Sequence, residues 1–73
     1  MQRFRYGERV RVADPTHHLY ERVGVVTRVR DADGAAVVEM DKAIPEAAQL
    51  VIQGVRYERS AIVFPGHCER VRR

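Results

Sequence analysis

The chain has 73 residues, with thirteen Lys and Arg against ten Asp and Glu, a formal net charge of +3, one Cys and no Trp. This length fits one domain, so we predict that residues 1–73 form a single domain. Such a chain buries only roughly 60% of its unfolded surface, which excludes a large enzyme cleft with its own supporting shell. No apolar run is long enough to span a membrane.

The segment Met1–Arg5 lacks the apolar stretch of a signal peptide. The lone Cys68 cannot form an internal disulfide, which suits a reducing compartment. These two features predict a cytoplasmic protein.

Apolar residues make up 45% of the chain, with twelve Val, three Ile and only two Leu. β-branched side chains lose rotamer freedom in helices and pack well on a pleated sheet. The composition therefore predicts an all-β fold.

The first strand is expected at residues 9–12, where polar and apolar side chains alternate. This pattern places Val10 and Val12 toward the core. Arg9 and Arg11 then point outward to solvent.

An aspartate and a proline interrupt this pattern, so residues 14–22 are expected to form a long surface loop. A second strand is expected at residues 23–30. Strict alternation places Val25, Thr27 and Val29 on one face of it, which we expect to be the core face.

Residues 31–34 read Asp-Ala-Asp-Gly, a strong signal for a hairpin turn. The third strand follows, with Ala36, Val38 and Met40 on one face and Val37 on the other. We expect the face of Ala36, Val38 and Met40 to line the core.

Residues 41–49 are expected to form a connection in which residues 45–48 make one helical turn after a proline. A second hairpin or bulge is expected around Gln53-Gly54, between apolar runs at residues 50–52 and 55–57.

Ser60 is expected to begin a short turn that delivers Ile62, Val63 and Phe64 to the core, and residues 68–71 to form a last strand. Five to six short antiparallel strands in so short a chain predict a small closed or nearly closed barrel.

Two valine pairs bear on assembly, because alternation buries only one member of each pair. The outward members are expected to be Val26 and Val37, close together on the first hairpin. An exposed apolar patch of this kind marks interfaces, so we predict a homo-oligomer.

Charge is unevenly spread, with a net +4 over residues 1–30, −4 over residues 31–53 and +3 over residues 54–73. If the first and last strands are neighbours, the two basic ends form one face and the acidic segment lies apart. Such a face favours nucleic acid or an acidic protein surface, and an ordinary solvated surface explains it equally well.

The stretch Gly7-Glu8-Arg9-Val10-Arg11-Val12, a loop and Gly24-Val25-Val26 resembles the opening of SH3-like small barrels of the KOW kind. The length of the loop, its proline and aromatics, and Val23-Gly24 resemble the stromal SH3-like protein of photosystem I over residues 7–40. The resemblance implies an SH3-like barrel. Its KOW form implies nucleic-acid binding.

Residues Phe4 and Gly7–Arg11 are also similar to the opening of type II dihydrofolate reductases. That likeness implies an enzyme whose site forms at an oligomer axis. The V-Q-I-Y segment that carries the reductase site is absent, and Val51-Ile52-Gln53-Gly54 is not a substitute for it.

Candidate metal ligands are His17, His18, His67 and Cys68, whose spacing matches no zinc motif. The two adjacent histidines in an extended segment are expected to point apart, while His67 and Cys68 follow a turn that brings them toward the first loop. We expect no metal and no cofactor. The single Ser60 and Cys68 lie in no nucleophile motif, so we expect no catalysis.

The loop carries hydrogen-bonding, aromatic and cationic side chains close together, and the outward arginines of the first strand lead into it. Aromatic and arginine side chains dominate binding hot spots. We predict a non-catalytic module that docks onto a protein or nucleoprotein assembly, with nucleic acid as the second partner class. The predicted binding residues are Arg9, Arg11, His17, His18, Tyr20 and Arg22.

Overall fold

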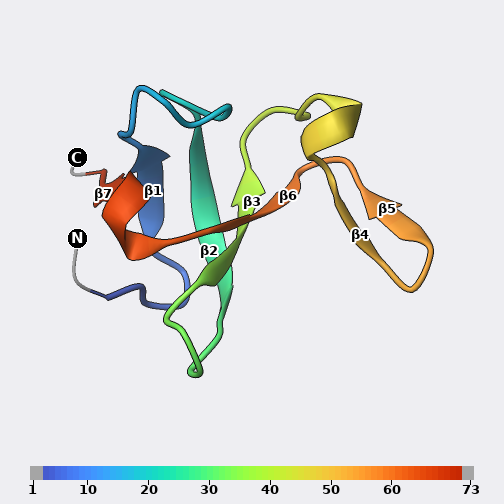
Figure 1. Cartoon of the computed structure of the whole chain (residues 1–73). Coiled ribbons are helices and arrows are strands. Elements are labelled where there is room, and N and C mark those ends of the chain that lie inside the picture. Colours follow the sequence, from blue (N-terminus) through green and yellow to red (C-terminus); the bar gives the residue numbers. More distant parts are fainter. Residues whose placement is uncertain (1–2, 72–73) are drawn as a thin grey trace.

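The computed structural model describes residues 3–71, which form seven strands and two short 3-10 helices. Five strands form one antiparallel sheet in the order β6-β3-β2-β1-β7, and β4 with β5 forms a separate hairpin (Figure 1). The elements are β1 (Arg9–Val12), β2 (Val23–Val29), β3 (Ala36–Met40), η1 (Glu46–Ala48), β4 (Leu50–Ile52), β5 (Val55–Tyr57), β6 (Ser60–Val63), η2 (Pro65–His67) and β7 (Cys68–Arg70).

The all-β prediction is confirmed, although the described residues form seven strands rather than the expected five to six. Strands β6 and β7 are the two edges of the five-stranded sheet, so the ladders over residues 3–71 do not close it into a barrel. No helix in this part of the chain is long and apolar enough to cross a membrane.

Gly24 sets the close approach of the central strands. It lies opposite Val10 in the β1–β2 ladder, and both residues are buried. A Cβ at Gly24 would lie 2.5 Å from Val38 Cγ1 and 2.6 Å from the Glu39 carbonyl oxygen. Only glycine fits this position without a shift of β3.

A β-bulge in β2 changes which valines face the core. Val26 lies opposite Val38 and Arg28 lies opposite Val37, so Thr27 is the extra residue between them. Val26 is fully buried, with 0% of its surface exposed.

The predicted alternation of Val25, Thr27 and Val29 is therefore wrong at its first two positions. Val25 is half-buried beside outward Glu39, and Thr27 is exposed. Because the bulge shifts the pattern by one residue, Val29 still packs against the core.

The valine patch expected to join copies of the chain does not exist. Val26 belongs to the core, and Val37 is half-buried on the other face of β3. The prediction of a homo-oligomer loses the surface on which it rested.

Strand β6 also differs from the expectation. Ser60 begins a strand rather than a turn, and its inward residues are Ala61 and Val63. Ile62 and Phe64 are exposed, because alternation along a strand sends them to the opposite face.

Three of the predicted turns are confirmed, at residues 31–34, 45–48 and 53–54. The helical turn after Pro45 is η1, and the segments at 31–34 and 53–54 connect antiparallel strands. Gln53 and Gly54 both have positive φ, 51° and 80°, as the two-residue turn of this hairpin requires.

The core lies against one face of the five-stranded sheet, and no residue of β4 or β5 belongs to it. The predicted inward positions Val10, Val12, Ala36, Val38 and Met40 are confirmed as buried. The core cluster comprises Phe4, Val10, Val12, Leu19, Val26, Ala36, Val38, Met40, Ile44, Ala61, Val63 and Cys68.

Candidate partner-binding site

The 14–22 loop is fastened to the sheet at its base. The Val12 amide donates to the Arg22 carbonyl at 2.9 Å, and the Glu21 amide donates to the Val12 carbonyl at 2.8 Å. Glu21 makes this return with a positive φ of 72°.

The loop is not wholly a surface excursion, because Leu19 is buried in the core. Its side chain anchors the middle of the segment, and burial of a leucine stabilises by roughly 1.5–3 kcal/mol. The neighbouring Tyr20 is left 41% exposed at the edge of the loop.

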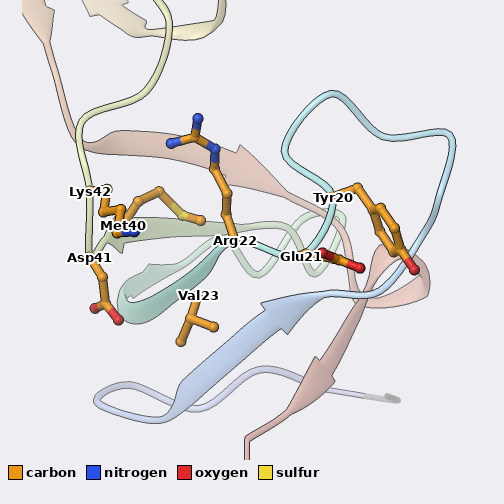
Figure 2. A pocket seen from close by; sticks show the side chains of 7 residues that line it. All are labelled: Tyr20, Glu21, Arg22, Val23, Met40, Asp41 and Lys42. Carbon is orange, nitrogen blue, oxygen red and sulfur yellow. The ribbon is translucent and has the colours of Figure 1, made fainter.

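A groove of about 380 Å³ lies between the end of this loop and the end of β3. Figure 2 shows Arg22 rising between Tyr20 on one side and the chain of Met40 to Lys42 on the other. Two carboxylates and two cations accompany the apolar side chains. The groove is lined by Tyr20, Glu21, Arg22, Val23, Met40, Asp41 and Lys42.

Arg22 braces the two walls of the groove. Its guanidinium donates to the Ala43 carbonyl at 3.0 Å, across the gap between loop and β3. Arg9 is held near the rim, where its guanidinium contacts the Asp41 carboxylate at 3.0 Å. Among the predicted binding residues, Tyr20 and Arg22 line the groove and Arg9 contacts one of its walls.

Arg11 is engaged elsewhere on the sheet. Its Nε donates to Glu69 Oε1 at 2.8 Å, on the neighbouring strand β7. This hydrogen bond, with the charge of Glu69, raises the pKa of Arg11 above its ordinary value. Arg11 is not among the groove residues.

The histidines form a cluster of their own against the turn that precedes β7. The rings of His17 and His18 stack with centroids 4.5 Å apart, so the expectation that they point apart is wrong. The His67 ring lies 5.3 Å from His17, and its Nε2 lies 3.5 Å from Asp14 Oδ2. The expected approach of His67 to the first loop is confirmed.

His17 supports the loop as an acceptor. The Leu19 amide donates to His17 Nδ1 at 3.1 Å. Partial burial, followed by the nearby His18 and His67, lowers the pKa of His17 from its ordinary 6.5. The neutral imidazole is therefore the form that suits the folded loop.

Among the described residues, no group of three or more His, Cys, Asp or Glu side chains is placed to hold a metal ion. Cys68 is buried, and this burial raises the pKa of its thiol to about 11. A thiol that stays protonated near neutral pH is a poor nucleophile.

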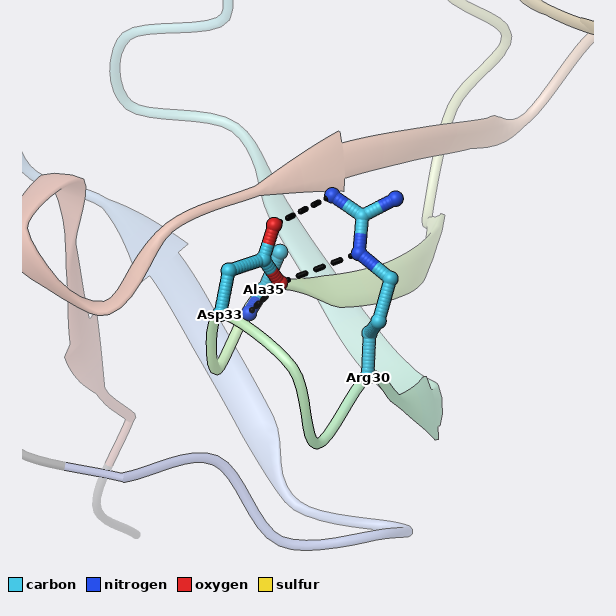
Figure 3. Close-up of polar contacts among 3 residues, drawn as sticks. All are labelled: Arg30, Asp33 and Ala35. Carbon is cyan, nitrogen blue, oxygen red and sulfur yellow. Dashed lines mark hydrogen bonds and ion pairs between the residues drawn. The ribbon is translucent and has the colours of Figure 1, made fainter.

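The basic and acidic segments are interleaved rather than separated. The first and last strands are neighbours as expected, but Arg70 meets Glu8 at 2.7 Å across them. In the hairpin turn, Arg30 binds both Asp33 oxygens, and the Ala35 amide donates to the same carboxylate (Figure 3). The expectation of an acidic segment set apart is wrong, since Asp41 also contacts Arg9.

The residues missed by sequence reasoning are Met40, Asp41 and Lys42 on the second wall. Met40 ends the third strand, Asp41 and Lys42 follow it, and the loop precedes the second strand. Because β2 and β3 pair antiparallel, the start of one lies beside the end of the other. The predicted hairpin of the second and third strands was therefore enough to place these residues beside the loop.

No family model, no curated protein and no solved structure matches this chain.

Proposed function

We propose that the chain is a non-catalytic binding module with an SH3-like fold, and that it docks onto a protein partner through the groove beside Tyr20. Two features support the fold assignment. The first and last strands pair, and the loop that follows the first strand folds back against the sheet.

The main observation in support of the proposal is the exposed ring of Tyr20. It lies at one end of a groove whose floor includes half-buried Val23 and the buried Met40. Tyrosine offers a large, rigid contact area and a polar tip, and it is enriched in interface hot spots. Arg22 beside it is held by the Ala43 carbonyl, so little freedom is lost when a partner binds.

A protein partner is favoured over nucleic acid because five arginines of the described residues are engaged with carboxylates. Nucleic-acid affinity comes mainly from cations that meet phosphates. Here a phosphate would compete with a carboxylate at each of five arginines, namely Arg9, Arg11, Arg30, Arg56 and Arg70.

The test compares Tyr20→Ala with Tyr6→Ala, a matched control because Tyr6 is 81% exposed and lies outside the groove. Partners captured by the wild type, with and without nuclease, are identified, purified and titrated by calorimetry at low and high salt. We expect Tyr20→Ala to weaken binding at least tenfold, about 1.4 kcal/mol, and Tyr6→Ala to leave it unchanged.

Capture that disappears with nuclease and weakens steeply with salt would overturn the proposal in favour of nucleic acid. Equal affinity of the two tyrosine variants would place the site elsewhere. The reductase alternative predicts quenching of nicotinamide cofactor fluorescence on titration with the protein, and we expect none.

A further inference from the structure

The hairpin of β4 and β5 projects from the five-stranded sheet as an arm (Figure 1). Its apolar side chains are about half exposed, with Val51 at 50%, Ile52 at 48% and Val55 at 53%. An isolated two-stranded hairpin is marginal at best in water. The arm therefore carries apolar surface that the described part of the chain, residues 3–71, leaves exposed.

The two faces of the arm differ in chemistry. The register pairs Leu50 with Tyr57 and Ile52 with Val55, so one face carries four apolar side chains and no charge. The opposite face carries the central pair of Val51 and Arg56. All three side chains of β4 are therefore apolar, whereas β5 carries one charge, at Arg56.

A groove of about 600 Å³ lies between β4 and residues of β2, β3 and β6. Leu50, Val51 and Ile52 form one wall, and the exposed Ile62 of β6 lies among the residues of the other. Charges occur at the β2 end of the groove. The lining comprises Arg28, Val29, Arg30, Asp31, Ala35, Ala36, Val37, Leu50, Val51, Ile52 and Ile62.

The edge of β4 that faces away from β5 is open for pairing. In a hairpin with a two-residue turn, Ile52 and Val55 exchange hydrogen bonds, so the next pair does not. The amide and carbonyl of Val51 then point away from β5. Within residues 3–71, no backbone group of another segment forms a hydrogen bond with the Val51 amide or carbonyl.

We propose that this edge is covered by a second copy of the same chain. The two β4 strands pair antiparallel across a two-fold axis at Val51, which places Val51 opposite Val51 and Leu50 opposite Ile52. Every one of these cross-strand pairs is apolar. Pairing through β5 instead would set Arg56 against Arg56, and like charges directly opposite destabilise a ladder.

The exposed area fits this occupant. A monomeric protein of 8.4 kDa exposes about 4,600 Å². This chain exposes 5245 Å². The excess of about 600 Å² approaches the roughly 800 Å² that each partner buries in an ordinary stable interface.

The first experiment is sedimentation velocity from micromolar to millimolar protein, on the wild type, Val51→Lys and Tyr6→Lys. Both variants add one positive charge at an exposed position, and circular dichroism melts establish that both stay folded. We expect the wild type and Tyr6→Lys to form a dimer of twice 8.4 kDa. We expect Val51→Lys to raise the dimer dissociation constant at least tenfold.

A second experiment fixes the axis with cysteine cross-linking, using diamide to oxidise two thiols to a disulfide. Across the proposed axis the two Val51 Cα atoms lie about 5.5 Å apart, within disulfide reach. The two Val55 residues are separated by three strand spacings, about 14 Å. Val51→Cys should cross-link and Val55→Cys should not, and the buried Cys68 stays unreacted in both.

A wild type that remains monomeric at millimolar concentration would overturn the proposal. An association that Val51→Lys leaves unchanged, or faster cross-linking through Val55→Cys, would also overturn it. None of these results bears on the Tyr20 groove, because no residue is shared between the two surfaces.

Discussion

The five-stranded sheet and the β4–β5 arm are built from the same residue types and differ in what covers them. Val10, Val26 and Val63 in the sheet are at most 1% exposed, whereas Val51 and Val55 in the arm are half exposed. These three sheet valines face a shared core, while the two arm valines face solvent or the groove.

The difference teaches that burial is decided by strand order rather than by composition. Burial of apolar surface stabilises the folded state by about 25 cal/mol for each Å². A valine on a sheet is buried in this way only where a second layer of side chains covers it. In this chain, β1, β2, β3, β6 and β7 share one sheet over the core, and the inserted hairpin lies outside it.

The largest effect is expected at the closest approach inside the sheet. Gly24→Ala places a Cβ within 2.6 Å of a β3 backbone oxygen, so the strands must separate. We expect a loss of about 3 kcal/mol in the free energy of unfolding, measured by urea denaturation. Gly66→Ala is the control, because nothing lies within 4 Å of its added Cβ. Equal stability of the two variants would contradict the packing described for β2 and β3.

A matched pair of valine truncations compares the two regions directly. Val26→Ala leaves a cavity in the core, and we expect a loss of about 2 kcal/mol. Val55→Ala in the arm should change the unfolding free energy by less than about 0.5 kcal/mol at protein concentrations where the chain is monomeric. Chemical denaturation in one buffer measures the unfolding free energy of both variants. Similar losses of stability would show that the arm is part of the cooperative core.

The smallest effect is expected in the 14–22 loop, which lies outside the sheet but is anchored in its core. Because the folded state lowers the pKa of His17, the unfolded chain binds the proton first as the pH falls below 6.5. The melting temperature should therefore fall with the pH below this value. His17→Asn keeps an oxygen acceptor for the Leu19 amide and should reduce the slope. A slope unchanged in His17→Asn would contradict the assignment of this pH dependence to His17.

Local patterns predicted most of the strands and the turns at residues 31–34, 45–48 and 53–54, but they placed a turn at Ser60, where a strand begins. Alternation placed Val10 and Val12 correctly, because nothing interrupts β1. It failed at Val25 and Val26, since a bulge adds one residue and leaves no mark in the polar and apolar pattern.

The lining of the candidate groove was predicted in part, at Tyr20 and Arg22. The loop and Tyr20 follow from sequence, because a polar segment between strands exposes its side chains. Leu19 was missed because a single apolar residue in a polar loop does not reveal that it reaches the core. The stacking of His17 on His18 depends on the fold of the loop around Asp14, which residue spacing does not specify.

The buried cysteine makes the opening of the sheet edge measurable by thiol labelling. Cys68 begins β7, an edge strand held to the sheet by β1, and its thiol is shielded and protonated in the closed state. The rate at which a thiol-reactive dye labels Cys68 at neutral pH is therefore limited by how often β7 separates from β1. The labelling rate therefore reports how often β7 separates from β1, at a core position to which the β4–β5 arm contributes no residue.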